Sequence, residues 1–326
     1  MELQGKKIAV IGLAKTGLAT VAFLLGRGAK VTATDMNPQS LAAASFPGMK
    51  TAPHDPEILE GVDLVVPSPG VPPANPILRA AVTKGIPILS ELELAGRFLR
   101  IPLIAVTGTN GKTTTTALIG HILAQSGRKA FVGGNIGAPL IGYVGGPQAD
   151  DRAVIEVSSF QLQWSGTLHP AVAVLLNVTA DHLDYHGSFA AYRAAKERLF
   201  ANQTAMDTAI LNGDDAGTAA LAPRLAARTL CFRSGGAVTT GMYAENDGLI
   251  YVSPEGEKET YPREMVKLPG THNLENVMAA VMAARSCGCS PAEIAAAVAS
   301  FPGFPHRIEY VGERRGVSFY DDSKGT

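Results

Sequence analysis

Short apolar runs alternate with Ala-rich stretches through the first hundred residues. The runs are rich in β-branched residues and predict buried strands, while the stretches between them have helical spacing. This alternation predicts a parallel sheet that is covered by helices on both faces. The predicted strands are 7–12, 30–35, 62–70 and 86–90, and the predicted helices are 17–28 and 91–100.

A second and larger unit repeats this pattern, beginning with the apolar run IPLIAV. Its predicted strands are 101–106, 153–157, 171–178, 208–212 and 229–232, and its predicted helices are about 188–200, 274–286 and 291–300. We therefore expect an α/β fold with a Rossmann-like parallel-sheet domain over 1–97. A larger P-loop-type α/β domain is expected over 98–302.

The segment SFPGFPH (300–306) is rich in glycine and proline and predicts a boundary. Residues 303–326 then carry two strand-like runs around a turn. A two-stranded hairpin is marginally stable alone, so we expect the opening hairpin of a third domain that these 326 residues do not complete. A small docked β-extension is the alternative.

Composition and charge narrow the class of protein. The 326 residues are 46% hydrophobic and 17% charged, with a formal net charge of -1. A nearly neutral chain gives no electrostatic argument for nucleic acid or an anionic membrane as partner. No run reaches the roughly 18 apolar residues of a membrane span. The three cysteines fit a reducing compartment, and together these features predict a cytoplasmic protein.

The most informative stretch is AVTGTNGKTTTT (105–116), which follows an apolar run. A tight loop between a strand and a helix presents backbone N–H groups and the helix dipole to an anion. Gly108, Gly111 and Lys112 meet this need, and the Thr113 hydroxyl can reach a metal ion. The spacing departs from the usual Walker A motif, because its additional glycine is missing. The loop still predicts binding of a nucleotide phosphate, with an ordinary strand–helix turn as the alternative.

Three further side chains are candidates for chemistry. Glu156 lies at the carboxyl edge of the predicted sheet, where ligands gather, and a buried carboxylate there favours a metal ion over a solvent-exposed glutamate. His182 follows an apolar strand and is either a ligand or a polar surface residue. Lys196 shares one face of the predicted helix 188–200 with apolar residues. It is either a snorkelling lysine or a desolvated, reactive one. The apolar residues on that face are Phe189, Tyr192, Leu199 and Phe200.

Another glycine motif, GLAKTG (12–17), follows the first predicted strand. Ala14 replaces the middle glycine of a dinucleotide fingerprint, and Asp35 ends the second strand. By itself this pattern points weakly to NAD. An NAD-dependent oxidoreductase and a non-catalytic nucleotide-binding switch are therefore the competing hypotheses.

A family resemblance accounts for the motifs together. GTNGKTT (108–114) resembles the ATP loop of the Mur ligase and folylpolyglutamate synthase superfamily. Six further stretches look like the D-glutamate-adding Mur ligases and follow the family order. They are EVSSFQL (156–162), NVTADHLDYHG (177–187), YRAAKERLF (192–200), GTHNLENVMAA (270–280), FPHRIEYV (304–311) and DDSKGT (321–326).

The resemblance implies ATP-driven addition of D-glutamate to UDP-N-acetylmuramoyl-L-alanine through an acyl phosphate, in peptidoglycan precursor synthesis. It also implies a monomer. In the family a third domain binds the incoming amino acid, so we expect these 326 residues to bind substrates without ligating them.

The resemblance also implies roles for individual residues. The catalytic residues would be Lys112, His182 and Lys196. ATP would contact Gly108, Thr109, Asn110, Gly111, Lys112, Thr113, Thr114, Asn273, Asn276, Arg307 and Asp322. Two magnesium ions would be held by Thr113, Glu156, His182 and a carbamylated Lys196. The UDP substrate would contact Lys15, Thr16, Asp35, Ser68, Asn135 and His182.

Overall fold

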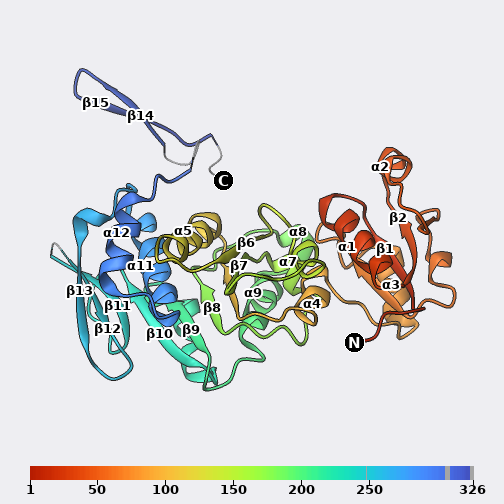
Figure 1. The fold of residues 1–326 in the computed structure, drawn as a ribbon, viewed down its shortest axis with the longest axis horizontal. Coiled ribbons are helices and arrows are strands. Elements are labelled where there is room, and N and C mark those ends of the chain that lie inside the picture. The colour runs from red at the N-terminus through yellow and green to blue at the C-terminus, as the bar shows by residue number, and fades with distance from the viewer. Residues whose placement is uncertain (247, 305–308, 324–326) are drawn as a thin grey trace.

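The structure is a computed structural model that describes residues 1–246, 248–304 and 309–323. Two sheets lie side by side along the long axis of the molecule, with the N-terminal sheet at one end (Figure 1). The expected α/β class is confirmed. The proposed boundaries at 97 and 302 stay a prediction.

The N-terminal sheet has four parallel strands in the order β3-β2-β1-β4. They are β1 (Lys7–Ile11), β2 (Lys30–Thr34), β3 (Lys50–Thr51) and β4 (Leu64–Pro67). Around them lie α1 (Lys15–Gly26), α2 (Pro38–Ala43), the 3-10 helix η1 (Pro56–Leu59) and α3 (Pro76–Thr83).

The predicted strand at 86–90 is wrong. Only Ile88 bridges to Val65 of β4, as an isolated pair. Pro87 has no N–H to donate, and Ser90 already caps the next helix, α4 (Glu91–Gly96). Too few residues remain for a strand.

The second sheet has nine strands in the order β13-β12-β11-β10-β9-β8-β5-β7-β6. The strands from β6 to β11 pair in parallel, and β12 and β13 are antiparallel additions at one edge. The strands are β5 (Leu103–Thr107), β6 (Ala130–Gly134), β7 (Arg152–Glu156), β8 (Val172–Leu175), β9 (Thr208–Asn212), β10 (Arg228–Arg233), β11 (Gly241–Glu245), β12 (Gly248–Val252) and β13 (Lys258–Pro262).

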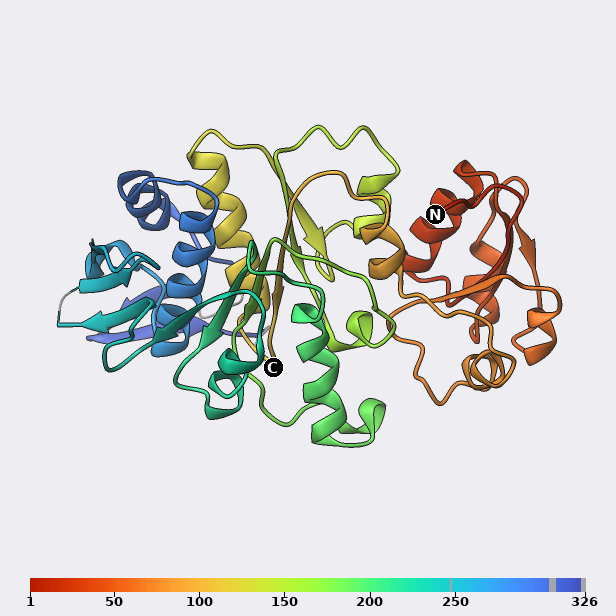
Figure 2. The ribbon, with the colours of Figure 1, turned by 90° about the horizontal axis from the view of Figure 1, so that it is seen from below.

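Both faces of the large sheet are buried, which explains the unbroken apolar runs of its central strands. In β5, Leu103 and Ala105 face one core, whereas Ile104 and Val106 face the other. Figure 2 shows the helices above and below the strands. The helices of this unit are α5 (Lys112–Gln125), α6 (Leu140–Val144), α7 (Ser159–Leu162), α8 (Leu183–His186), α9 (Phe189–Glu197), η2 (Arg198–Phe200), α10 (Ala216–Ala219), η3 (Ala222–Arg224), η4 (Arg263–Met265), α11 (Thr271–Ser286) and α12 (Pro291–Ser300).

The predicted helix 188–200 is divided into α9 and η2. Tyr192, Lys196 and Leu199 are buried on its inner face, as the spacing predicts. Phe189 is the exception and stays 41% exposed. It is the first residue of α9, before the helix reaches the core.

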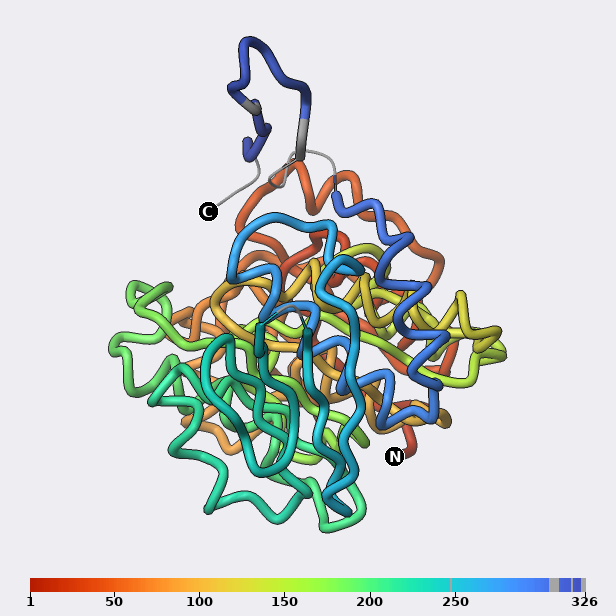
Figure 3. The backbone as a smooth tube through the Cα atoms, turned by 90° about the vertical axis from the view of Figure 1, so that its left-hand side faces the viewer, coloured from red at the N-terminus to blue at the C-terminus, as the bar shows by residue number. Residues whose placement is uncertain are grey.

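The predicted C-terminal hairpin is present as β14 (Glu309–Arg314) and β15 (Val317–Asp321), which pair antiparallel in a separate sheet. Figure 3 shows this hairpin standing away from the rest of the chain. Arg307 lies outside the described residues. Within the part of the chain that the structure describes, no helix is long and apolar enough to cross a membrane.

Candidate functional site

The phosphate-loop residues form a left-handed turn between β5 and α5. Gly111 is the N-cap of α5 with φ 84°, a conformation that other residues rarely adopt. A Cβ atom on Gly111 would also lie 2.1 Å from Oδ1 of Asn276. Among the described residues no side-chain hydrogen bond caps the N-terminus of α5, and a helix N-terminus favours an anion.

Two lysines converge on this loop. Lys112 Nζ donates to the carbonyl oxygens of Gly108 and Thr109, at 3.0 and 2.7 Å. Lys196 Nζ donates to the same Gly108 oxygen at 2.7 Å and lies 4.7 Å from the centre of the Tyr192 ring. Lys196 is only 2% exposed. The snorkelling alternative for this lysine is therefore wrong.

The environment of Lys196 changes its protonation. Burial first, and then the nearby charge of Lys112, lower the pKa of the Lys196 amine to about 7. A substantial fraction of this amine is therefore neutral at neutral pH. A neutral buried amine is a nucleophile, which an ordinary surface lysine is not.

Glu156 lies at the end of β7 beside the loop and is 3% exposed, so the solvent-exposed alternative is wrong. The Thr113 hydroxyl donates to its Oε2 at 2.8 Å, and Asn135 Nδ2 donates to its Oε1 at 2.8 Å. Carboxylate and hydroxyl oxygens are ligands suited to Mg²⁺. Thr113 and Glu156 therefore fit a magnesium ion at the phosphate loop.

His182 precedes α8 in a left-handed conformation, with φ 50°. Its backbone N–H donates to Asp181 Oδ1 at 2.8 Å, and its Nε2 lies 3.6 Å from Asp181 Oδ2. The His182 side chain is about half exposed. It is therefore open to a ligand, and the Phe160 ring lies 4.8 Å from its ring, centre to centre.

No group of three or more His, Cys, Asp or Glu residues suited to a metal is present within residues 1–246, 248–304 and 309–323. A second metal at His182 therefore needs an additional oxygen donor. A carbamate on Lys196 would supply one. The residues present fit this group because the Lys196 amine is buried, partly neutral and beside the phosphate loop.

The predicted UDP-binding residues gather around one cavity of about 420 Å³ at the carboxyl edge of the N-terminal sheet. Asp35 accepts N–H groups from Leu13 and Asn37, at 2.6 and 2.7 Å. The cavity is lined by all five predicted positions outside the His182 loop, namely Lys15, Thr16, Asp35, Ser68 and Asn135.

Asn273 and Asn276 are buried near the start of α11. The Thr115 hydroxyl donates to Asn276 Oδ1 at 3.3 Å, and Asn276 Nδ2 donates to Asn273 Oδ1 at 3.3 Å. This pair therefore lies against the phosphate loop. Asp322 directly follows β15, and its expected contact with ATP stays a prediction, as does that of Arg307.

The sequence analysis missed Asn177 and Thr179, which contact the loop from the segment that follows the neighbouring strand β8. Asn177 Oδ1 accepts the Asn110 N–H at 2.8 Å, and the Thr109 hydroxyl accepts the Thr179 N–H at 3.0 Å. Their position could have been predicted from the sequence, because they stand at the end of the predicted strand 171–178, and the carboxyl ends of adjacent parallel strands meet at one edge of a sheet.

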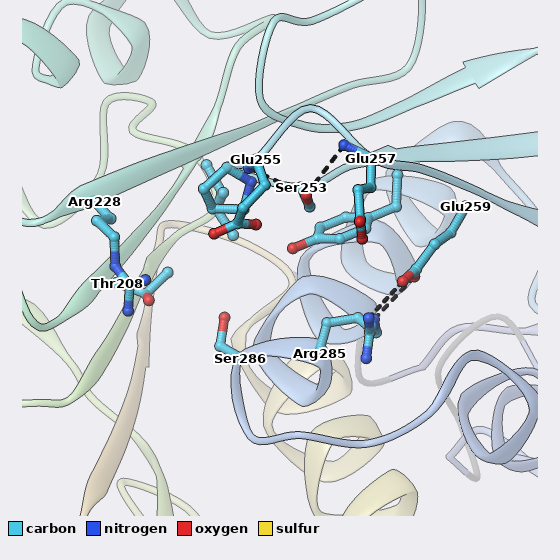
Figure 4. Close-up of a pocket in the computed structure, with 11 residues that line it drawn as sticks. Thr208, Arg228, Ser253, Glu255, Glu257, Glu259, Arg285 and Ser286 are labelled. Atoms are coloured by element: carbon cyan, nitrogen blue, oxygen red, sulfur yellow. Dashed lines mark hydrogen bonds and ion pairs between the residues drawn. The ribbon is translucent and has the colours of Figure 1, made fainter.

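A separate cavity of about 300 Å³ lies at the amino ends of β9 and β10 (Figure 4). Arg285 forms an ion pair with Glu259 at 2.5 Å on one side, and Arg228 and Thr208 lie on the other. None of the predicted site residues lines this cavity.

Comparison with known proteins agrees with the sequence motifs. The family model "Mur ligase MurD-like, N-terminal domain" matches residues 6–90, and "Mur ligase middle domain" matches residues 106–284. A protein of Syntrophus aciditrophicus named UDP-N-acetylmuramoylalanine–D-glutamate ligase is 52% identical over the whole chain and 74% of its own length. The chain belongs to the Mur ligase family. The first unit thus matches Mur ligases, and the NAD-dependent oxidoreductase hypothesis is set aside.

Other comparisons extend this result. A Geobacter metallireducens protein with the same name is 44% identical, over all of this chain and 74% of its own length. Among solved structures, a Neisseria meningitides UDP-N-acetylmuramate:L-alanyl-gamma-D-glutamyl-meso-diaminopimelate ligase gives a TM-score of 0.61 at 20% identity, covering 92% of this chain and 99% of that one. The UDP-N-acetylmuramate-alanine ligase of Thermotoga maritima gives 0.54 at 22% identity, covering 97% and 74%. These two similarities show the fold alone.

Proposed function

We propose that this chain serves the ATP-dependent addition of D-glutamate to UDP-N-acetylmuramoyl-L-alanine, a step of peptidoglycan precursor synthesis, as a monomer. The 326 residues would bind the substrates without completing the ligation. Family membership already makes it an ATP-dependent, amide-forming ligase. The observation that carries the finer proposal is the convergence of Lys112, Lys196 and the Thr113–Glu156 pair on one phosphate loop. The names of the relatives support the choice of substrates.

In the first step, the carboxylate of the UDP substrate attacks the γ-phosphorus of ATP, and the bond to ADP breaks. Both reactants are anions, so catalysis rests mainly on positioning and charge neutralisation. Lys112 and the N–H groups of the loop would hold the phosphates. Magnesium at Thr113 and Glu156, and a second ion at His182 and carbamylated Lys196, would supply further positive charge.

In the second step, the amine of D-glutamate attacks the acyl carbon of the acyl phosphate. A C–N bond forms, the C–O bond to phosphate breaks, and the amine loses a proton as inorganic phosphate leaves. In both steps the ATP-binding role proposed for Asn273, Asn276, Arg307 and Asp322 is to hold the nucleotide in place.

The carbamate itself forms when a neutral lysine amine adds to CO₂, with loss of one proton. The lowered pKa of Lys196 supports this reaction near neutral pH. Intact-mass measurement in bicarbonate buffer under non-denaturing conditions tests it. We expect an added CO₂ on the native chain and none on Lys196→Met; an unmodified native chain would contradict the carbamate.

Calorimetric titration with UDP-N-acetylmuramoyl-L-alanine tests the substrate assignment, with NAD as the control ligand. We expect saturable binding of the UDP-sugar and none of NAD. Binding of NAD alone would reject the proposal. A phosphate-release assay with ATP and D-glutamate in the same preparation tests the expectation that these 326 residues bind substrates without ligating them.

A further inference from the structure

The one-turn helix α8, which directly follows His182, is held on one side by α7. Ser159 Oγ of α7 lies 3.0 Å from Nε2 of His186, within hydrogen-bond distance. The Phe160 ring lies 4.2 Å from the ring of Tyr185 and 4.8 Å from that of His182, centre to centre. The position of His182 is therefore tied to that of α8.

The other side of α8 contacts the N-terminal unit. The Tyr185 hydroxyl donates to the backbone carbonyl of Val71 at 3.2 Å, between residues 114 positions apart. Burial raises the pKa of Tyr185 to about 12, so this hydroxyl keeps its proton at neutral pH. Figure 1 shows α8 at the end of the large sheet that faces the N-terminal unit.

Val71 belongs to the cavity that is proposed to take the UDP group. It lines this cavity together with Ser68, and its N–H donates to the Ser68 carbonyl at 3.0 Å. A Cβ atom on Gly12 would lie 3.2 Å from the Val71 side chain, so Val71 also packs against the glycine loop. A ligand that orders this cavity wall also fixes the acceptor of the Tyr185 hydrogen bond.

We propose that Tyr185 is a positioning residue that couples the UDP cavity to the His182 side of the nucleotide site. The inference rests on the proposed function, because it takes that cavity and that loop to be the two substrate sites. Filling the cavity holds the Val71 carbonyl in place, and the hydrogen bond then holds α8 and His182 in the geometry that receives the metal-bound nucleotide. Coupling of this kind is reciprocal, so the nucleotide also favours the filled cavity.

If Tyr185 only stabilised the packing of α8, it would do so through its aromatic ring. The ring packs on Phe160 and lies 4.8 Å from the ring of His186, both within the large unit. The hydroxyl, by contrast, reaches the other unit. Tyr185→Phe removes the hydroxyl and keeps the ring, which separates the two roles.

The experiment measures the affinity of the chain for ADP with Mg²⁺, by calorimetry, with and without saturating UDP-N-acetylmuramoyl-L-alanine. In the native chain we expect the UDP-sugar to tighten nucleotide binding about fivefold or more. In Tyr185→Phe this factor should fall close to one, while nucleotide affinity without the UDP-sugar changes less than about twofold. Tyr261→Phe is the matched control, because its hydroxyl donates to Glu259 at the distant edge of the sheet, at 3.0 Å.

An unchanged coupling factor in Tyr185→Phe would overturn the inference, and so would a factor of one in the native chain. A native chain that binds neither ligand would overturn the proposed function and the inference with it. Loss of the factor in Tyr261→Phe as well would assign the effect to general destabilisation, against the inference.

Discussion

At the scale of single residues, the two lysines at the phosphate loop set the charge of the site. Lys112 and Lys196 both donate to the carbonyl oxygen of Gly108, so two ammonium groups would repel each other there. The buried lysine is the one whose pKa falls to about 7. Lys196 is therefore the amine that can react.

Lys112→Ala should weaken binding of ADP with Mg²⁺ and abolish any ATP consumption that the native chain shows, because it removes the side-chain amine that lies on the phosphate loop. A loss on the order of 10²–10³-fold in rate is typical of removing one electrostatic contact of this kind. The melting temperature should stay close to native. Lys84→Ala is the control, since Lys84 is exposed at the end of α3. Near-normal ATP consumption by Lys112→Ala would reject the assignment.

Lys196→Met should make the chain more stable at pH 6.5 than the native protein. The folded-state pKa of about 7 lies below the usual 10.5, so below pH 7 folding buries an ammonium group. This cost is relieved as pH rises from 7 towards 10.5, where the folded chain binds fewer protons than the unfolded one. The stability difference, a few kcal/mol at pH 6.5, should shrink at pH 9.5.

Urea unfolding in bicarbonate-free buffer at the two pH values measures this difference. A difference that does not change with pH would mean that Lys196 keeps an ordinary pKa.

The sequence predicted the site residues where a strand ends and missed the contacts between distant segments. Glu156 was predictable, because ligands bind at the carboxyl ends of parallel strands and a carboxylate buried there needs a partner such as a metal ion. The role of Tyr185 was not. Its hydrogen bond joins residues 114 positions apart, and no spacing along the chain encodes that approach.

At the scale of elements, α4 is the joint between the two units and buries two carboxylates. Glu93 accepts backbone N–H groups from Gly166, Thr167 and Leu168, at 3.0, 2.9 and 3.1 Å. Although burial opposes it, hydrogen bonds from Thr167, Gly166 and Arg97 lower the pKa of Glu93. Glu91 accepts the Ile141 N–H at 2.7 Å, and burial raises its pKa to about 7 although hydrogen bonds from Ile141 and Gln161 oppose the shift.

Glu91→Gln should stabilise the chain increasingly as the pH rises. The folded-state pKa of about 7 exceeds the usual 4.5, so the native chain loses stability between these pH values as the buried carboxyl must ionise. The gain over native should be small at pH 5 and roughly 3 kcal/mol at pH 8. Urea unfolding at pH 5 and pH 8 measures it.

Glu93→Gln is the opposite case, because its carboxylate is satisfied in the folded state. We expect that variant to be less stable than native at both pH values. If Glu91→Gln were also less stable than native at both pH values, the Glu91 carboxyl would be ionised in the folded state, and the prediction would be wrong.

Helices and strands were predictable from the sequence in proportion to their length and burial. Strand β9 was predicted residue for residue. All five of its residues are buried, and all but the last, Asn212, are apolar or β-branched. The four-residue helices α7 and α8 are too short to show a helical period. Strand β13 was missed because its side chains are mostly exposed, with Tyr261 alone buried.

At the scale of the whole molecule, the two sheets share one hydrophobic core. This core joins Val10 and Val66 of the small sheet to Ile155 of the large one, through α1, α4 and α6. Phe23 of α1 meets Phe98 edge to face, with ring centres 5.2 Å apart. The sequence predicted a simple boundary at 97, because apolar periodicity shows that a helix is buried but not which sheet it is buried against.

Because of this shared core, residues 1–302 should unfold in one calorimetric transition. Phe23→Ala should cost about 3–5 kcal/mol, the usual cost of removing a buried phenyl ring, and should separate the unfolding of the N-terminal sheet as a second, lower transition. Phe301→Ala is the matched control: this ring is similarly buried but belongs to the core on the opposite face of the large sheet. It should lower the melting temperature while keeping one transition. Two transitions in the native chain would mean that the shared core does not link the two units energetically, and that the Tyr185–Val71 hydrogen bond joins parts that otherwise unfold independently.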